Sequence, residues 1–152
     1  MRILLINGPN LNMLGEREPE VYGRLTLAEI ESKVAERAKA LGAELRSFQS
    51  NHEGAIVDFI QQEAPAADGL IINGGALTHY GLSLRDALAG AGKPAIEVHI
   101  SNIYGRERFR RRSVTADVCR GLIAGLGWHG YVAALEALVD LASKKLGAPT
   151  DQ

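Results

Sequence analysis

Residues 69–75, Gly-Leu-Ile-Ile-Asn-Gly-Gly, decide the fold class of this chain. An apolar run without alternation, closed by an Asn-Gly-Gly turn signal, predicts a buried strand. Strands of parallel sheets have this character because helices cover both of their faces. Residues 2–6 form a second such run, which ends at the turn Asn-Gly-Pro of residues 7–9. These two runs predict strands of one parallel sheet.

Helical patterns lie between the apolar runs. Thr26 and Glu29 form a capping-box pattern ahead of a helix that ends at Gly42, and Ser50 with Glu53 predicts a second capping box for a helix that stops near residue 65. Further helices are expected over about residues 80–91 and 131–146, and further strands over 43–48, 95–100 and 120–126.

Strands that alternate with helices predict βαβ units. Five strands in 152 residues favour an α/β fold of the flavodoxin-like type, a three-layer, doubly wound domain with a five-stranded parallel sheet. The length suits one domain. We expect residues 1–146 to form a single catalytic domain and residues 147–152 to form a flexible C-terminal tail.

Composition narrows the function classes. Lys and Arg number 17 against 18 Asp and Glu, a net charge of -1, which argues against general nucleic-acid binding. No apolar run approaches the roughly 20 residues that a membrane helix needs. The lone Cys119 can form neither an internal disulfide nor a cysteine zinc site, and indicates a reducing compartment such as the cytoplasm.

Polar residues follow three of the predicted strands. Ligands of open α/β sheets bind outside the carboxyl ends of the strands, so we expect these residues to meet at one edge. They are Asn10, Asn12, Arg17 and Tyr22 in a long loop over residues 7–25; Asn73, Gly75 and His79 after the third strand; and His99, Ser101, Asn102, Arg106 and Arg110 at and after the fourth.

Glu97 and His99 lie two residues apart on a predicted interior strand, so their side chains point to the same face. Burying a carboxylate there costs free energy unless it is paired with another group. One interpretation is a general acid, His99, oriented by Glu97; the other is a structural ion pair.

The other candidates also have more than one interpretation. Tyr22 could act as a base with its pKa lowered by Arg17, or could simply pack the loop. Asn10 and Asn73 could donate to an oxyanion, or could be turn residues. The arginine run of residues 106–112 could clamp a carboxylate, could pair with a neighbouring subunit, or could be solvated.

The sequence argues against several kinds of cofactor or metal site. Residues 125–130 match a dinucleotide fingerprint, but too little chain follows to supply another strand and its ribose-binding acid. No phosphate-binding P-loop is present, and the four histidines lack metal-ligand spacing. We therefore expect neither a metal nor a cofactor.

Taken together, the motifs resemble those of type II 3-dehydroquinate dehydratase, in order and nearly without gaps from Ile3 to about Leu138. The matching segments are NGPNLN (7–12), REP (17–19), YG (22–23), QSNHEG (49–54), GALTH (75–79), LRDA (84–87), EVHISNI (97–103), RE (106–107) and FR (109–110).

This resemblance implies the loss of water from 3-dehydroquinate to give 3-dehydroshikimate, by anti elimination through an enolate, without a cofactor. The implied catalytic residues are Tyr22 as the base, Arg17 holding its phenolate, Asn10 at the enolate oxygen, and His99 as the acid oriented by Glu97. The implied substrate-binding residues are Asn73, Gly75, His79, Asp86, Ile100, Ser101 and Arg110. Arg106 fits a lid or structural role better.

The family also implies a homododecamer, a tetramer of trimers, in which Asp86 reaches into a neighbouring subunit's site. Dehydroquinases of the other class use a Schiff-base lysine, but no lysine of this chain ends a predicted strand. Two alternatives remain: a flavodoxin-like small-anion binding module without catalysis, and a structural oligomer that uses the arginine run. We expect no nucleic-acid or membrane partner.

Overall fold

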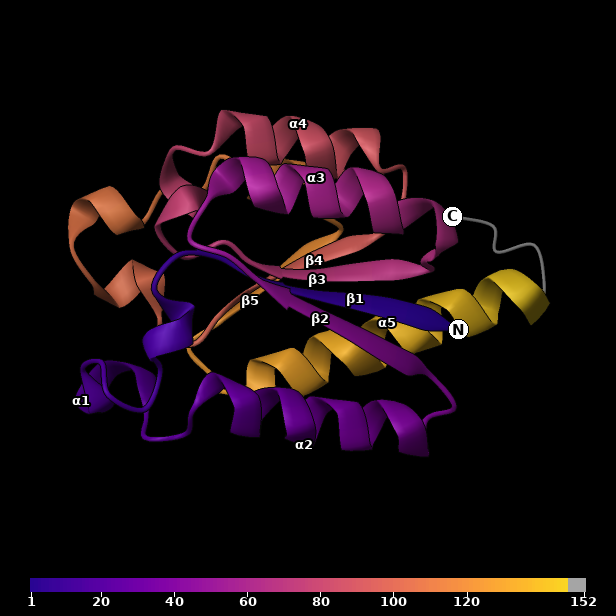
Figure 1. The fold of residues 1–152 in the computed structure, drawn as a ribbon, viewed down its shortest axis with the longest axis horizontal. Helices are drawn as coiled ribbons and strands as arrows, with labels where there is room; N and C mark the ends of the chain where they lie inside the picture. The colour runs from indigo at the N-terminus through magenta and orange to yellow at the C-terminus, as the bar shows by residue number, and fades with distance from the viewer. Residues whose placement is uncertain (148–152) are drawn as a thin grey trace.

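The computed structural model describes residues 1–147, which fold around a five-stranded, all-parallel sheet (Figure 1). The strands are β1 (Arg2–Asn7), β2 (Glu44–Gln49), β3 (Gly69–Asn73), β4 (Ala95–His99) and β5 (Gly121–Ala124). The helices are α1 (Pro19–Tyr22), α2 (Leu27–Ala40), α3 (Glu53–Glu63), α4 (Leu82–Gly90) and α5 (His129–Gly147). The strand order β2-β1-β3-β4-β5 is the flavodoxin-like order, so the predicted fold class is confirmed.

Helices cover both faces of the sheet, with α2 and α5 on one side and α3 and α4 on the other (Figure 1). Successive residues of β1 alternate between the two cores, since Ile3 and Leu5 pack with α2 and α5 while Leu4 and Ile6 pack with α3 and α4. This explains the apolar runs without alternation. Within residues 1–147, no helix is both long and apolar enough to cross a membrane.

One of the two predicted capping boxes is wrong. The Thr26–Glu29 box forms in both directions at the start of α2. In contrast, α3 begins after His52, and Glu53 Oε2 accepts a hydrogen bond from the backbone N–H of Leu84, 3.0 Å away. Ser50 Oγ accepts from the His52 N–H instead. A contact with α4 has therefore replaced the local one.

Other boundaries differ from the expectation by a few residues. The loop of residues 7–25 contains two short helical turns, Leu11–Met13 and α1. Helix α4 starts at Leu82, after a 3-10 turn, and strand β5 is limited to Gly121–Ala124. Helix α5 includes Gly147, which we had assigned to the tail; residues 148–152 lie outside the described part of the chain.

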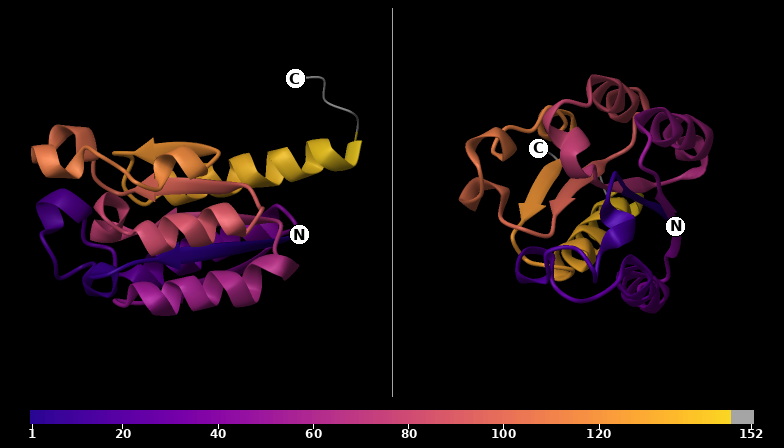
Figure 2. Two further views of the ribbon diagram at one scale, coloured as in Figure 1. Left: turned by 90° about the horizontal axis from the view of Figure 1, so that it is seen from above. Right: turned by 60° about the vertical axis from the view of Figure 1, so that its left-hand side comes forward.

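The sheet register brings the strand ends together. Asn7 pairs with Gln49 of β2 on one side and with Asn73 of β3 on the other. Figure 2 shows that α1 and the segment after β4 project from the same end of the molecule. The carboxyl edge of the sheet is thus flanked by the two longest irregular segments.

Candidate active site

The predicted site residues converge in one pocket at this carboxyl edge. All but two of them line it: Asn10, Arg17, Tyr22, Asn73, Gly75, His79, His99, Ile100, Ser101 and Arg110. Of the two exceptions, Glu97 lies behind His99, and Asp86 lies elsewhere on the molecule. The convergence expected from the strand ends is therefore present.

His99 and Glu97 form a buried pair at the end of β4. The His99 Nε2 and Glu97 Oε2 atoms are 2.9 Å apart, and the two residues are 5% and 0% exposed. This contact leaves the other ring nitrogen, Nδ1, for a second partner. A carboxylate in this position fixes the ring orientation.

Two hydroxyl groups hold the far side of the Glu97 carboxylate. Ser113 Oγ donates to Oε1 at 2.9 Å, and Thr115 Oγ1 donates to the same oxygen. Burial alone would raise the pKa of Glu97, but hydrogen bonds from His99, Thr115 and Ser113 outweigh it and hold the pKa below its ordinary value. Glu97 is therefore ionised at neutral pH.

We expect Thr115→Val to lower the free energy of unfolding at pH 7 by about 1–3 kcal/mol, because a buried acceptor loses a donor. A carboxylate with a lowered folded-state pKa stabilises the fold above the unfolded-state pKa, and this stabilisation is lost as the pH falls through the folded-state value. The difference between variant and wild type should therefore shrink below pH 4.5, the ordinary pKa of Glu97. Urea titrations at a series of pH values measure it.

Thr78→Val is the matched control. Thr78 is 1% exposed, and its Oγ1 has no hydrogen-bond partner within the described residues, so the same substitution there should cost little. An equal loss of stability in both variants would contradict the assignment of Thr115 to the Glu97 site.

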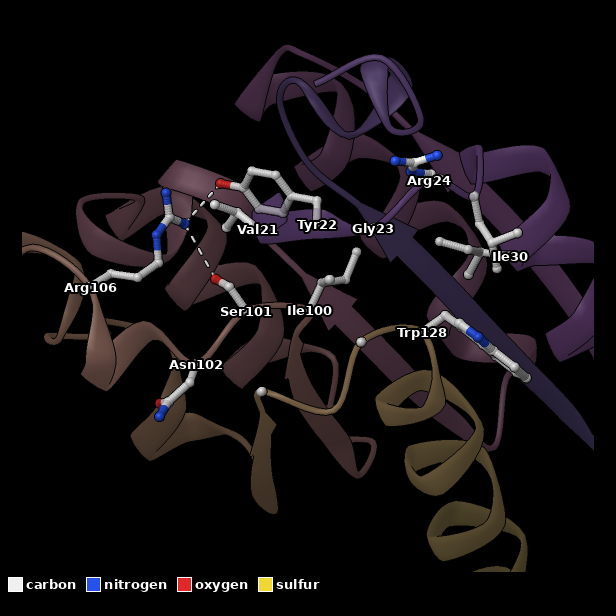
Figure 3. A pocket seen from close by; sticks show the side chains of 13 residues that line it. Val21, Tyr22, Gly23, Arg24, Ile30, Ile100, Ser101, Asn102, Arg106 and Trp128 are labelled. Atoms are coloured by element: carbon white, nitrogen blue, oxygen red, sulfur yellow. Dashed lines mark hydrogen bonds between the residues drawn. The ribbon is translucent and has the colours of Figure 1, made fainter. Parts of the chain in front are cut away.

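Tyr22, at the end of α1, lines the same pocket as His99. Its hydroxyl accepts a hydrogen bond from Arg106 Nη1 at 2.8 Å, and the same nitrogen lies 3.3 Å from Ser101 Oγ (Figure 3). The Arg17 and Arg106 guanidinium carbons lie 4.6 Å and 5.3 Å from the centre of the Tyr22 ring. Two positive charges therefore adjoin the phenol.

Arg106 lies at the sheet edge, as expected, but its contact with Tyr22 was not predicted from the sequence. It stands in a run with five arginines in seven residues, and nothing in that pattern distinguishes it. Arg17 contacts the face of the Tyr22 ring, whereas Arg106 hydrogen-bonds the hydroxyl. The direct contact to the phenol oxygen thus comes from the residue we had assigned to a lid or structural role.

The loops after β1 and β3 pack against each other closely enough to require glycine. A Cβ at Gly8 would lie 2.3 Å from the carbonyl oxygen of Gly74, and one at Gly75 would lie 2.9 Å from that of Pro9. Gly75 also has a φ of +58°, which favours glycine. Asn10 follows in the left-handed region, and its backbone N–H donates to Asn51 Oδ1 at 2.9 Å. The position of the Asn10 amide at the pocket is therefore fixed by its backbone.

The remaining wall is polar. His79 Nδ1 lies 2.7 Å from the carbonyl oxygen of Arg112 and must donate to it, so a neutral His79 presents Nε2 as an acceptor. Arg110 Nε donates to Glu107 at 2.7 Å, which directs a guanidinium at the pocket. Ile100 and Ser101 continue the chain beyond β4 and supply backbone N–H groups and a hydroxyl.

A family model described as dehydroquinase class II matches residues 1–139. The chain belongs to this family. It is 63% identical over 139 residues to a 3-dehydroquinate dehydratase of Roseiflexus castenholzii, covering 91% of this chain and 88% of the relative. A relative of the same name from Halothermothrix orenii is 55% identical over 143 residues, covering 94% and 97%.

Solved structures agree with the class II dehydroquinase assignment. Type II dehydroquinase from Butyrivibrio crossotus superposes with a TM-score of 0.89 at 48% identity, covering 91% of this chain and 97% of that chain. The enzyme from Propionibacterium acnes gives a TM-score of 0.89 at 41% identity, covering 91% and 96%.

Asp86 is the one predicted site residue of this dehydroquinase that its own chain keeps away from the pocket. It lies on the exposed side of α4, in a groove between α3 and α4 that Val57, Gln61 and Ala87 also line. Within one chain it therefore cannot contact a ligand bound at the carboxyl edge.

Proposed function

We propose that this class II dehydroquinase removes water from 3-dehydroquinate to give 3-dehydroshikimate in the pocket described above. The observation that carries the proposal is the presence of two preorganised groups in one pocket. A phenol held beside two guanidinium groups and an imidazole held by a buried carboxylate both line it. A base and an acid in one small pocket suit an elimination that removes a proton and a hydroxyl group.

Tyr22, as the phenolate, takes the C2 proton of the substrate. The electrons of the C2–H bond move into the adjacent ketone and form an enolate, which Asn10 stabilises through a bridging water molecule. The enolate then expels the C1 hydroxyl, which takes a proton from His99 and leaves as water. Glu97 orients His99 throughout, and Arg17 with Arg106 lowers the energy of the phenolate.

The substrate-binding roles follow the pocket wall. Ile100 and Ser101 bind the carboxylate through backbone N–H groups and the hydroxyl. His79 and Arg110 bind ring hydroxyl groups, and Asn73 with Gly75 closes the floor of the pocket. The proximity of these residues to one another supports the assignment.

Asp86 completes the site only if another subunit presents it, and a homododecamer built as a tetramer of trimers would do so. The exposed position of Asp86 on α4 supports this. Residues 1–146 act as one catalytic domain in this proposal. The lone cysteine supports a reducing compartment, the cytoplasm.

Turnover by purified wild-type protein tests the activity. We expect the conjugated product to accumulate in the ultraviolet, and no turnover would favour the small-anion binding module instead. Borohydride added with substrate should leave the activity intact, because no lysine among the described residues lines the pocket and a Schiff base has no amine from which to form. Covalent trapping of substrate on a lysine would contradict the enolate route.

A further inference from the structure

A buried phenol lies beneath the floor of the pocket and has no part in the mechanism above. Tyr131, on α5, is 0% exposed. Its hydroxyl donates to Asn7 Oδ1 at 2.6 Å and accepts from Asn73 Nδ2 at 2.8 Å. Asn7 and Asn73 are register partners at the ends of β1 and β3. One hydroxyl on a helix thus joins the ends of two central strands.

The donor and the acceptor of each hydrogen bond can be assigned, starting from Gly75. The Gly75 N–H donates to Asn73 Oδ1 at 3.2 Å, so the other end of that amide, Nδ2, must face Tyr131. The phenol oxygen therefore accepts from Asn73, and its own proton must go to Asn7. Burial raises the pKa of Tyr131, so the hydroxyl keeps this proton at neutral pH.

The hydrogen bonds of Tyr131 leave one buried donor unpaired, which costs free energy that packing alone does not explain. Asn7 is 0% exposed, and its Nδ2 has no hydrogen-bond partner within the described residues. An unpaired buried donor of this kind is rare and usually marks a function or a strained position. An apolar side chain in place of Asn7 would avoid the unpaired donor but would leave the phenol proton without its acceptor.

From this geometry, and resting on the proposed function, we infer that Tyr131 is a positioning residue for substrate binding. It holds the Asn73 amide so that the second N–H of Nδ2 serves the pocket while Oδ1 stays bound to Gly75. The wall at Asn73 therefore offers a hydrogen-bond donor and no acceptor. This selects a ligand with an oxygen lone pair at that point, such as a ring hydroxyl that itself donates elsewhere.

Tyr131→Phe tests the inference, because it keeps the ring in the core and removes only the oxygen. A contact made equally in the ground state and the transition state changes KM rather than kcat. We expect KM for 3-dehydroquinate and the Kd of 3-dehydroshikimate to rise about tenfold, the equivalent of one hydrogen bond, with kcat changed less than about twofold. A purely structural Tyr131 would lower the melting temperature and leave both constants unchanged, which would overturn the inference.

A double-mutant cycle with Asn73→Ala makes the test specific. If Tyr131 acts through the Asn73 amide, Tyr131→Phe should change the Kd of 3-dehydroshikimate less than about twofold in the Asn73→Ala background. An equal weakening in both backgrounds would show that the phenol acts by another route. The cycle is measured as product binding by calorimetry and does not depend on turnover. Absent turnover in the wild type would therefore refute the proposed function without affecting the comparison of the Kd values.

Asn7→Ala provides a second variant that keeps the phenol in place, should Tyr131→Phe fold poorly. It removes the acceptor that directs the phenol proton and also removes the unpaired Nδ2. We expect product binding to weaken in the same direction as in Tyr131→Phe but by a smaller factor. Unchanged product binding in folded Asn7→Ala would contradict the directional chain from Asn7 to Asn73.

Discussion

His99→Ala is expected to lower kcat about 10²- to 10⁴-fold, the range for loss of a general acid. Without the imidazole, the C1 hydroxyl must leave as hydroxide or take its proton from water. The Ser113 and Thr115 hydroxyls still hold Glu97, so the protein should fold. Binding of 3-dehydroshikimate should change little, because it needs no proton transfer. Steady-state kinetics and calorimetry measure the two effects separately.

His52→Ala is the matched control for this variant. His52 is exposed at the start of α3, and its side chain makes no capping hydrogen bond. Its turnover should equal that of the wild type. Wild-type turnover in His99→Ala would remove His99 from the mechanism, and loss of product binding together with turnover would indicate a structural role for the Glu97–His99 pair instead.

Tyr22→Phe is expected to reduce kcat by a similar factor, about 10²- to 10⁴-fold, because it removes the proposed base for the C2 proton. The phenyl ring still packs beneath Arg17 and Arg106, which lie 4.6 Å and 5.3 Å from its centre. The loop should therefore keep its conformation. Exchange of the C2 proton with deuterium oxide, followed by NMR, should also stop, and this isolates the proton-abstraction step.

The control for Tyr22→Phe is Tyr80→Phe, since Tyr80 is 63% exposed and does not line the pocket. It should be as active as the wild type. Continued C2 exchange in Tyr22→Phe would assign the base to another residue. An unchanged kcat would show that the Arg106–Tyr22 hydrogen bond serves the loop alone.

The fold was predictable because its signal is local. Residues 2–6 and 69–72 are apolar on both faces, and only a strand covered on both sides has that pattern. The Thr26–Glu29 box formed for a similar reason, since its partners belong to one helical turn. The Ser50–Glu53 box failed because Glu53 found a donor in α4, 31 residues away in the sequence, and no local pattern reports such a competitor.

The pocket was predictable only in part. Topology alone places the ends of parallel strands at one edge, so Asn73 and His99 were expected there. The contact of Arg106 with Tyr22 was missed because the choice of one arginine from the run depends on where Tyr22 lies in three dimensions. The roles of Thr115 and Tyr131 were missed because the sequence does not show which partners their hydroxyl groups contact.

The chain of bonds through Asn7, Tyr131 and Asn73 also constrains how this enzyme can evolve. The three residues come from β1, α5 and β3, so no single genetic change can replace them as a unit. Losing any one of them removes a hydrogen-bond partner from a buried neighbour, so each single replacement is expected to cost stability. Among related enzymes, substitutions at these three positions should therefore occur together rather than singly.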